Sequence, residues 1–276
     1  MSTGKIQMKS GHEIPLLGFG TYRLTGEKCR SAVLNALQTG YRHIDTASAY
    51  DNESDVAMAI KDSHIERSKL FITTKVWHSN LHFQDTIDEC RRSLDRLNTH
   101  YVDLLLIHWP NKSIPISNTL KAMEQLLDSQ MIRSAGVSNF TINHLKRAQA
   151  INTIPISVNQ VEFHPFLNQK ELLIYCKEHD IVVTAYSPIA RGKVTGHLTI
   201  KKLAMDKGVT AAQLTLAWLM QKGIVVIPKA STTEHIKKNF DSQQIRLTPK
   251  EMEAMENCNS GERLVQPHWA EFNIDY

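Results

Sequence analysis

Residues 70–108 read LFITTKVWHSNLHFQDTIDECRRSLDRLNTHYVDLLLIH, a pattern that predicts two strands joined by a helix. The first strand is an apolar run that ends on Lys75, and the second is an apolar run that ends on His108. Between them, the apolar residues of the stretch 83–97 recur at helical spacing. Strands that alternate with helices of this length are typical of parallel βαβ units.

The same alternation continues on both sides of this unit. Eight such strands suit a closed barrel better than an open sheet, and the first unit lacks the GxGxxG of a doubly wound dinucleotide fold. We therefore expect an α/β protein with the (β/α)8 TIM-barrel fold, in which residues 1–276 form a single domain. The expected strands are 16–20, 41–45, 70–75, 102–108, 132–138, 157–160, 181–186 and 224–228, and the expected helices are 27–39, 53–61, 83–97, 118–129, 142–150, 169–179, 211–221 and 233–240.

Two segments lie outside the repeating pattern. Residues 5–8 and 13–14 flank a turn at 9–12 and predict an N-terminal β-hairpin. After Pro249 we expect one more short helix and then a loop that contains several apolar residues, among them Trp269. We expect this C-terminal loop to fold over the barrel mouth.

The composition narrows the class of protein. Of the 276 residues, 42% are apolar and 22% are charged, which is ordinary for a globular protein. The net charge of +4 comes from basic residues spread along the chain, so we expect no nucleic-acid partner. No apolar run reaches the roughly 18 residues of a membrane span, and no apolar stretch follows the first residues as in a secretory signal. The four cysteines are widely separated, so we expect reduced thiols and a cytoplasmic location. Nothing in the sequence demands more than a monomer, which is the state we expect.

Four polar residues stand at or just beyond the ends of successive expected strands: Asp45, Tyr50, Lys75 and His108. Each alone has a structural explanation, such as a loop cap for Asp45 or a satisfied core histidine for His108. In a parallel barrel, however, all strand C-termini lie on one face, so these four side chains converge. A tyrosine, a lysine, a carboxylate and a histidine together are the parts of a general acid with a tuned pKa.

The chain resembles the aldo-keto reductases along nearly its whole length. Within that family it is most similar to the bacterial 2,5-diketo-D-gluconate reductase and methylglyoxal reductase branch. Any one of the matching motifs is weak, but their order and spacing together are specific. The motifs are GFGT at 18–21, YRHIDTA at 41–47 with Tyr50, ITTKVW at 72–77, RSL at 92–94, YVDL at 101–104, HWP at 108–110, GVSNF at 136–140, NQVE at 159–162 and IPK at 227–229.

The resemblance implies an enzyme that transfers hydride from NADPH to an aldehyde or ketone. Tyr50 is then the proton donor, Lys75 lowers its pKa from a value near 10, and Asp45 holds Lys75. His108 orients the carbonyl oxygen. The resemblance further implies a substrate pocket lined by Tyr22, Tyr50, Trp77, His108 and Trp109, with Trp269 a weaker candidate.

The resemblance also implies how the cofactor is held. Ser138, Asn139 and Gln160 match the carboxamide of nicotinamide, and Tyr186 stacks on its ring. The 2′-phosphate of NADP lies beyond the eighth strand, where His235 replaces the family's usual arginine. A histidine gives no bidentate pairing with phosphate, so NAD(H) use alongside NADP(H) stays open. The remaining expected cofactor contacts are Gly20, Thr21, Asp45, Ser187, Ile189, Arg191, Gly192, Lys229, Ser231, Thr232 and Asn239.

Other interpretations are possible from the sequence. A nicotinamide-binding regulatory subunit without turnover is one, although retention of all four acid-site residues favours an enzyme. An unrelated barrel hydrolase or isomerase would need a metal site or a carboxylate pair. His78 and His82 have i, i+4 spacing but no third ligand nearby, so we expect no metal.

Overall fold

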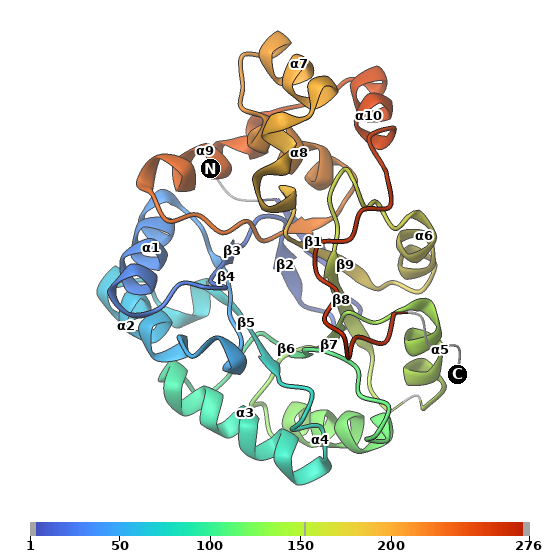
Figure 1. Cartoon of the computed structure of the whole chain (residues 1–276). Coiled ribbons are helices and arrows are strands. Elements are labelled where there is room, and N and C mark those ends of the chain that lie inside the picture. The colour runs from blue at the N-terminus through green and yellow to red at the C-terminus, as the bar shows by residue number, and fades with distance from the viewer. Residues whose placement is uncertain (1–3, 152, 273–276) are drawn as a thin grey trace.

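Eight parallel strands form the central sheet of the computed structural model, which describes residues 4–151 and 153–272. Each strand pairs with the next one in the sequence. The first and last strands also meet, because Gly18 N donates to Val226 O at 2.8 Å and Val226 N donates to Leu16 O at 2.9 Å. The sheet therefore closes, and the predicted barrel is confirmed (Figure 1). The strands are β3 Phe19–Gly20, β4 His43–Asp45, β5 Phe71–Val76, β6 Leu104–Ile107, β7 Ala135–Ser138, β8 Ile156–Glu162, β9 Val182–Tyr186 and β10 Val225–Val226.

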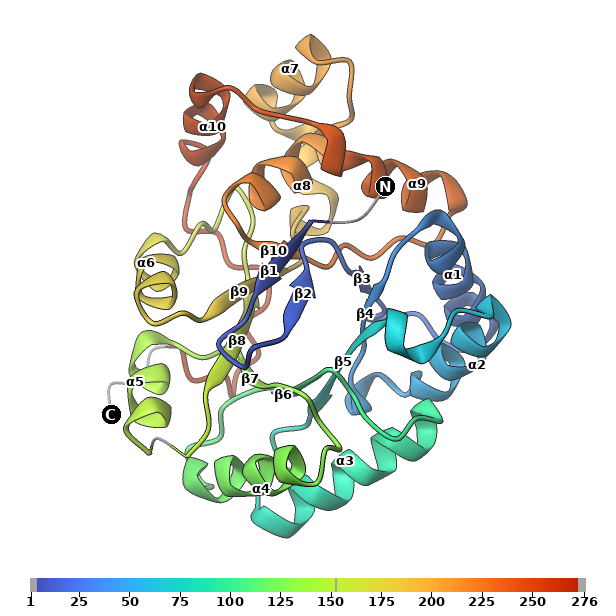
Figure 2. The same cartoon turned by 180° about the vertical axis from the view of Figure 1, so that it is seen from behind.

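Helices surround the barrel, and both views show them on its outside (Figures 1 and 2). Short 3-10 turns join several of them to the strands. The helices and turns are α1 Gly26–Thr39, η1 Ser48–Tyr50, α2 Glu53–Ser63, η2 Arg67–Lys69, α3 Phe83–Leu97, α4 Ile116–Asp128, α5 Ile142–Ile151, α6 Lys170–Glu178, η3 Ala190–Gly196, α7 Leu198–Asp206, α8 Ala211–Gln221, α9 Thr233–Asp241, η4 Ser242–Gln244 and α10 Pro249–Glu256.

The strand residues alternate between the inside of the barrel and the helices. Leu104 and Leu106 pack with the barrel interior, whereas Leu105 and Ile107 pack in the cluster that contains the helix residues. This period of two is the normal geometry of a strand. The interior cluster also contains Met8 and Ile14.

The two short strands β1 Lys5–Gln7 and β2 Glu13–Pro15 form the predicted hairpin, with Ile6 opposite Ile14. Figure 2 shows this hairpin lying across the back of the barrel. Because Met8 and Ile14 join the interior cluster, the hairpin closes the end of the barrel opposite the strand C-termini.

Helix α7 was not predicted, and the expectation that α8 alone follows the seventh strand was wrong. Two of its large apolar side chains face solvent, with Leu198 84% and Met205 70% exposed. Only Ile200 and Ala204 are buried. The apolar positions therefore do not all lie on one buried face, which is the pattern on which sequence-based helix prediction depends.

In the described part of the chain, no helix has both the length and the apolar character needed to cross a bilayer.

His43 in β4 makes stability depend on pH. Its ring is buried, with Nε2 3.1 Å from Thr73 Oγ1, and burial lowers its pKa to about 4. An unfolded histidine titrates near 6.5, so the unfolded chain gains a proton that the folded chain does not bind. Stability should therefore fall as the pH drops from about 6.5 to about 4, by about 3 kcal/mol for this group. Urea unfolding of wild type and His43→Gln across this range measures the effect. The variant should show the shallower pH dependence, and exposed His100→Gln should match wild type.

Candidate active site

The four predicted acid-site residues meet at the C-terminal end of the barrel. Asp45 ends β4, Lys75 lies in β5, and His108 follows β6. The turn η1 directs Tyr50 back toward these strands. The Lys75 ammonium lies 2.5 Å from Asp45 Oδ1, 2.7 Å from Thr46 O and 3.4 Å from the Tyr50 hydroxyl.

Lys75 and Asp45 form a buried ion pair. Their side chains are 0% and 2% exposed. Burial lowers the pKa of Lys75, and Asp45 opposes that change by stabilising the ammonium. The second oxygen of Asp45 accepts a hydrogen bond from Gln160 Nε2 at 2.6 Å. Each buried charge loses its hydration, which costs free energy, and such hydrogen bonds offset part of this cost.

The pKa of Tyr50 corrects one prediction. Burial of the hydroxyl raises this pKa well above 10, and the negative charge of Asp45 raises it further. The expectation that Lys75 lowers it was wrong for the free protein, in which burial and the nearby carboxylate set the direction of the change. Tyr50 therefore keeps its proton at neutral pH.

His108 is a neutral imidazole. Burial lowers its pKa well below 6.5, and the Lys75 charge lowers it further. Its ring lies edge-on to Tyr50 at 5.5 Å and to Trp77 at 5.0 Å between centroids. A neutral imidazole offers one N–H donor, which can bond an oxygen placed beside Tyr50.

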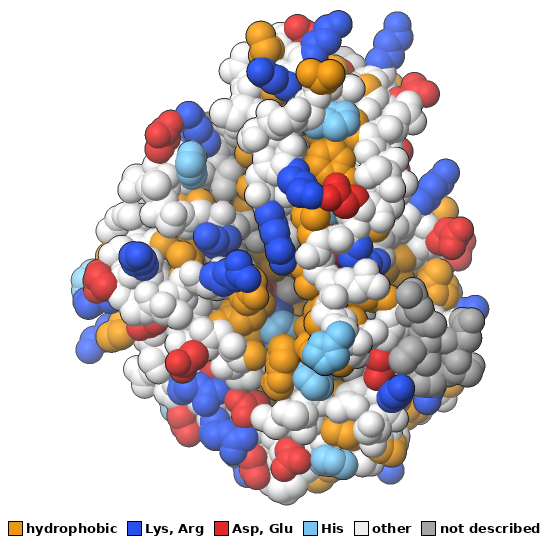
Figure 3. All heavy atoms as spheres, in the orientation of Figure 1, with side chains coloured by type: hydrophobic (Ala, Val, Ile, Leu, Met, Phe, Trp, Pro, Cys, Tyr) orange, Lys and Arg blue, Asp and Glu red, His pale blue; other side chains and the backbone are white. Residues whose placement is uncertain are grey.

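Asp45, Tyr50 and His108 line a cavity of about 1240 Å³, and Lys75 lies behind this lining with its side chain 0% exposed. Figure 3 shows it as a hollow in the middle of the face, with Lys and Arg side chains around it. Three of its lining residues, Arg23, Arg191 and Lys229, are basic. Of the lining carboxylates, Asp45 is paired with Lys75, and Glu89 with Arg92 and Arg96. The lining is therefore positive overall, which favours an anionic ligand.

Most of the sequence-predicted site residues line this cavity. At its inner end, Ser138 Oγ donates to Gln160 O at 2.8 Å, and the Tyr186 hydroxyl donates to Asn139 Oδ1 at 2.7 Å. These bonds fix the positions of the amides and of the Tyr186 ring. The predicted residues that line the cavity are Gly20, Thr21, Tyr22, Asp45, Tyr50, Trp77, His108, Trp109, Ser138, Asn139, Gln160, Tyr186, Ser187, Ile189, Arg191, Gly192 and Lys229.

Closure of the barrel requires a glycine at position 20, independently of the predicted contact between Gly20 and the cofactor. A Cβ at this position would lie 2.7 Å from the carbonyl oxygen of Ile227, closer than real Cβ contacts. Gly20 N donates to Pro228 O at 3.2 Å, in the zone where the barrel closes. The missing side chain therefore lets the first strand approach the last.

Four predicted cofactor residues lie outside the cavity lining. Ser231, Thr232 and His235 are exposed, whereas Asn239 is buried. Thr232 caps α9 by accepting a hydrogen bond from His235 N at 3.3 Å. Ser231, Thr232 and His235 lie at the N-terminus of α9, a position that attracts anions, whereas Asn239 lies near its C-terminus.

Three residues that matter at this site were missed or ranked low. Trp269 lines the cavity and packs on Trp109 at 5.1 Å and Trp77 at 5.8 Å between centroids. Glu162 and Glu271 hold the segment that carries Trp269. No local pattern gives these carboxylates an anchoring role, because their contacts span 102 and 127 residues of sequence.

The fold and the site define a (β/α)8 barrel protein with a tyrosine, a buried Lys–Asp pair and a neutral histidine in the barrel mouth. The sequence profile of the Aldo/keto reductase family matches residues 16–260, and the chain belongs to that family.

Individual relatives agree with this assignment. Glyoxal reductase of Bacillus subtilis (strain 168) is 38% identical over 260 residues, which are 94% of this chain and 94% of that protein. Methylglyoxal reductase DkgB of Escherichia coli O157:H7 is 37% identical over 257 residues, 92% of this chain and 96% of that protein. An aldo-keto reductase of Bombyx mori, solved in complex with NADP, is 30% identical and has a TM-score of 0.90 over 96% of both chains.

Proposed function

We propose that this protein reduces aldehydes and ketones to alcohols with NADPH, and that Tyr50 donates the proton. The observation that supports this most directly is the Tyr50 hydroxyl 3.4 Å from the Lys75 ammonium, in the same cavity as His108. The phenol and the imidazole thus both line the space where a carbonyl oxygen would become negative, and the ammonium lies behind the phenol. Donors fixed in advance around such an oxygen stabilise the developing charge.

The raised pKa of Tyr50 is compatible with a general acid that stays protonated until a strong base forms on the substrate. At neutral pH the phenol is fully protonated, so the acid form is always present. Once hydride has added to the carbonyl carbon, the carbonyl oxygen is an alkoxide, which is a stronger base than a phenolate and therefore takes the proton. Lys75 then stabilises the phenolate left behind by donating a hydrogen bond to it, and Asp45 holds Lys75 in place.

The cavity fits a nicotinamide dinucleotide. Its volume exceeds the roughly 300–1,000 Å³ of ordinary small-molecule sites, which leaves space for a dinucleotide and a substrate. When bound, the cofactor supplies the hydride. Ser138, Asn139 and Gln160 lie at the inner end to receive the carboxamide, and the Tyr186 ring offers a face for stacking. Arg191 and Lys229, which also line the cavity, would supply the positive charges for its phosphates.

The substrate class follows from the aromatic wall around His108. Trp77 and Trp109 give a general apolar surface beside the polar donors, which suits many small carbonyl compounds. Methylglyoxal, other reactive aldehydes and sugar-derived ketones such as diketogluconates are the substrates we propose. The named activities of the B. subtilis and E. coli relatives support the small dicarbonyls in particular.

An assay of NADPH consumption tests this proposal. With methylglyoxal or 4-nitrobenzaldehyde we expect turnover that requires both NADPH and the carbonyl compound, and formation of the alcohol. Tight NADPH binding without turnover on a broad panel would instead support a regulatory subunit that binds the cofactor without reducing a substrate. Absence of both binding and turnover would refute the proposal.

His235→Arg tests the cofactor preference. His235 is exposed near the N-terminus of α9, and an arginine there would add a planar donor for the 2′-phosphate. We expect the ratio of kcat/KM for NADPH to that for NADH to rise about tenfold, as one charge-assisted contact of about 1.5 kcal/mol implies. His235→Lys is the matched control, and it should give a smaller increase because its charge is compact. An unchanged ratio in His235→Arg would remove His235 from phosphate recognition.

A further inference from the structure

After α10 the chain returns across the barrel mouth, and we call residues 259–272 the strap (Figure 1). One anchor lies at its beginning. Glu162, at the end of β8, is fully buried and accepts hydrogen bonds from Leu264 N at 2.6 Å and Val265 N at 2.9 Å. Burial would raise the pKa of Glu162, but hydrogen bonds from His164 and these two amides lower it. The strap backbone is therefore held by a fixed carboxylate.

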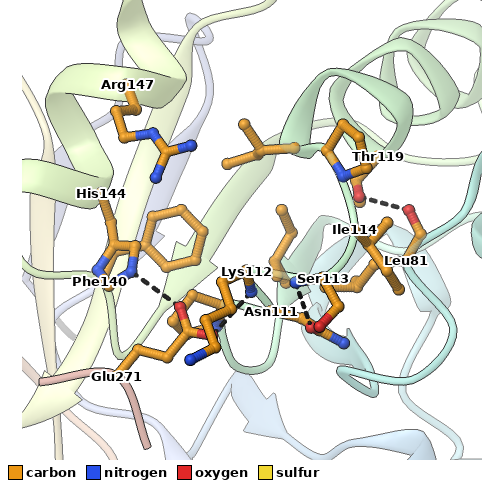
Figure 4. Close-up of a pocket in the computed structure, with 14 residues that line it drawn as sticks. Leu81, Asn111, Lys112, Ser113, Ile114, Thr119, Phe140, His144, Arg147 and Glu271 are labelled. Carbon is orange, nitrogen blue, oxygen red and sulfur yellow. Dashed lines mark hydrogen bonds and ion pairs between the residues drawn. The ribbon is translucent and has the colours of Figure 1, made fainter. Parts of the chain in front are cut away.

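A second anchor lies at the far end of the strap and uses a carboxylate of the strap itself. Glu271 is only 6% exposed and reaches into a separate cavity of about 260 Å³ beside α5 (Figure 4). Its Oε1 accepts a hydrogen bond from Lys112 N at 2.7 Å, and its Oε2 lies 3.3 Å from His144 Nε2. Lys112 belongs to the loop between β6 and α4, the loop that follows His108 and Trp109.

The hydrogen bonds of His144 show that its ring is the donor in the contact with Glu271. Thr141 N donates to His144 Nδ1 at 3.2 Å, so Nδ1 is an acceptor. Burial lowers the pKa of His144, although Glu271 opposes the change, so the ring is neutral and carries its proton on Nε2. That proton points at Glu271. Lys112 N and His144 Nε2 thus both donate to the carboxylate of Glu271.

Between the two anchors, the strap places one aromatic ring over the candidate active site. Trp269 stacks on His78 at 4.5 Å between centroids and lies edge-on to Trp77 and Trp109. Its side chain lines the large cavity, whereas the side chain of Glu271, two residues later, enters the small one. A turn in which Ala270 N donates to Pro267 O at 2.9 Å carries the ring. The strap is thus the wall between the two cavities.

We propose that Glu271 is a positioning residue that fixes Trp269 over the substrate end of the cavity and so favours aromatic aldehydes. This inference rests on the proposed function. A ring fixed at this distance from Trp77 and Trp109 completes an aromatic wall on three sides. An aromatic substrate gains contact with such a wall in stacked or edge-on geometry, whereas a three-carbon dicarbonyl gains little.

The test is a double-mutant cycle of Glu271→Ala and Trp269→Ala, with 4-nitrobenzaldehyde and methylglyoxal as substrates. We expect Glu271→Ala to raise KM for 4-nitrobenzaldehyde about tenfold, with kcat changed less than about twofold and little effect on methylglyoxal. In the Trp269→Ala background the same change should have almost no further effect. An equal tenfold increase in that background, or no increase at all, would overturn the proposal.

Two further variants separate positioning from general damage. Glu271→Gln keeps an acceptor for Lys112 N, so its KM for 4-nitrobenzaldehyde should lie much closer to the wild-type value than that of Glu271→Ala. Glu262→Ala removes an exposed strap carboxylate that pairs with Lys193, and it should leave KM near wild type because exposed pairs contribute little. A KM increase in Glu262→Ala equal to that of Glu271→Ala would count against a specific role for Glu271.

A readout without turnover keeps this inference distinct from the proposed function. Acrylamide quenching of tryptophan emission should increase in Glu271→Ala but not further in the double variant, because Trp269 covers Trp77 and Trp109. If wild type reduces no carbonyl compound, the proposed function fails while quenching still reports whether Glu271 positions Trp269. Unchanged quenching in Glu271→Ala would reject the positioning role.

Discussion

Tyr50→Phe is expected to lower kcat for aldehyde reduction by about 10²- to 10⁴-fold, the usual contribution of a positioned general acid. The variant removes one oxygen atom and keeps the ring, which packs edge-on to His108. Without the hydroxyl, the site loses the proton-bearing group that lies 3.4 Å from the Lys75 ammonium. Cofactor binding should change little, because the positive residues and the amides of the cavity are untouched.

The measurement combines NADPH consumption with direct titration of NADPH by its fluorescence. Tyr22→Phe is the matched control, since its ring lies 5.0 Å from that of Tyr50 and loses the same atom. We expect this control to keep kcat within a few-fold of wild type. If Tyr50→Phe retained more than about a tenth of wild-type kcat while binding NADPH normally, Tyr50 would not be the acid.

Sequence patterns located the ends of the strands near the site well, because the apolar segments before Asp45, Lys75 and His108 each run into a polar residue in a chain with a regular period. Asp45, Lys75 and His108 were predicted at strand ends, and closure of the barrel brings those ends onto one face. This inference needs only the order of elements and a known topology. Convergence of the site is therefore a property of the fold and not of any single motif.

The pKa of Tyr50 was beyond the reach of the sequence for a physical reason. Its direction depends on burial of the hydroxyl and on how Lys75 divides its charge between Asp45 and Tyr50. Those are distances and depths, and residue identities do not encode them. The anchors Glu162 and Glu271 were missed for a related reason, because each acts through a contact with a distant part of the chain.

Lys75→Met is expected to destabilise the fold by about 3–5 kcal/mol, because the carboxylate of Asp45 would stay buried without its ammonium. Urea unfolding measures this loss. Adding Asp45→Asn should recover much of it, since an amide at this position is uncharged and can still accept from Gln160.

Activity of the Lys75→Met/Asp45→Asn double variant should not return with its stability. In the double variant nothing stabilises the phenolate as Tyr50 gives up its proton, so kcat should stay at least about 10²-fold below wild type. A double variant that regained both stability and turnover would mean that the buried pair serves only the fold, and that the ammonium at 3.4 Å has no part in proton transfer.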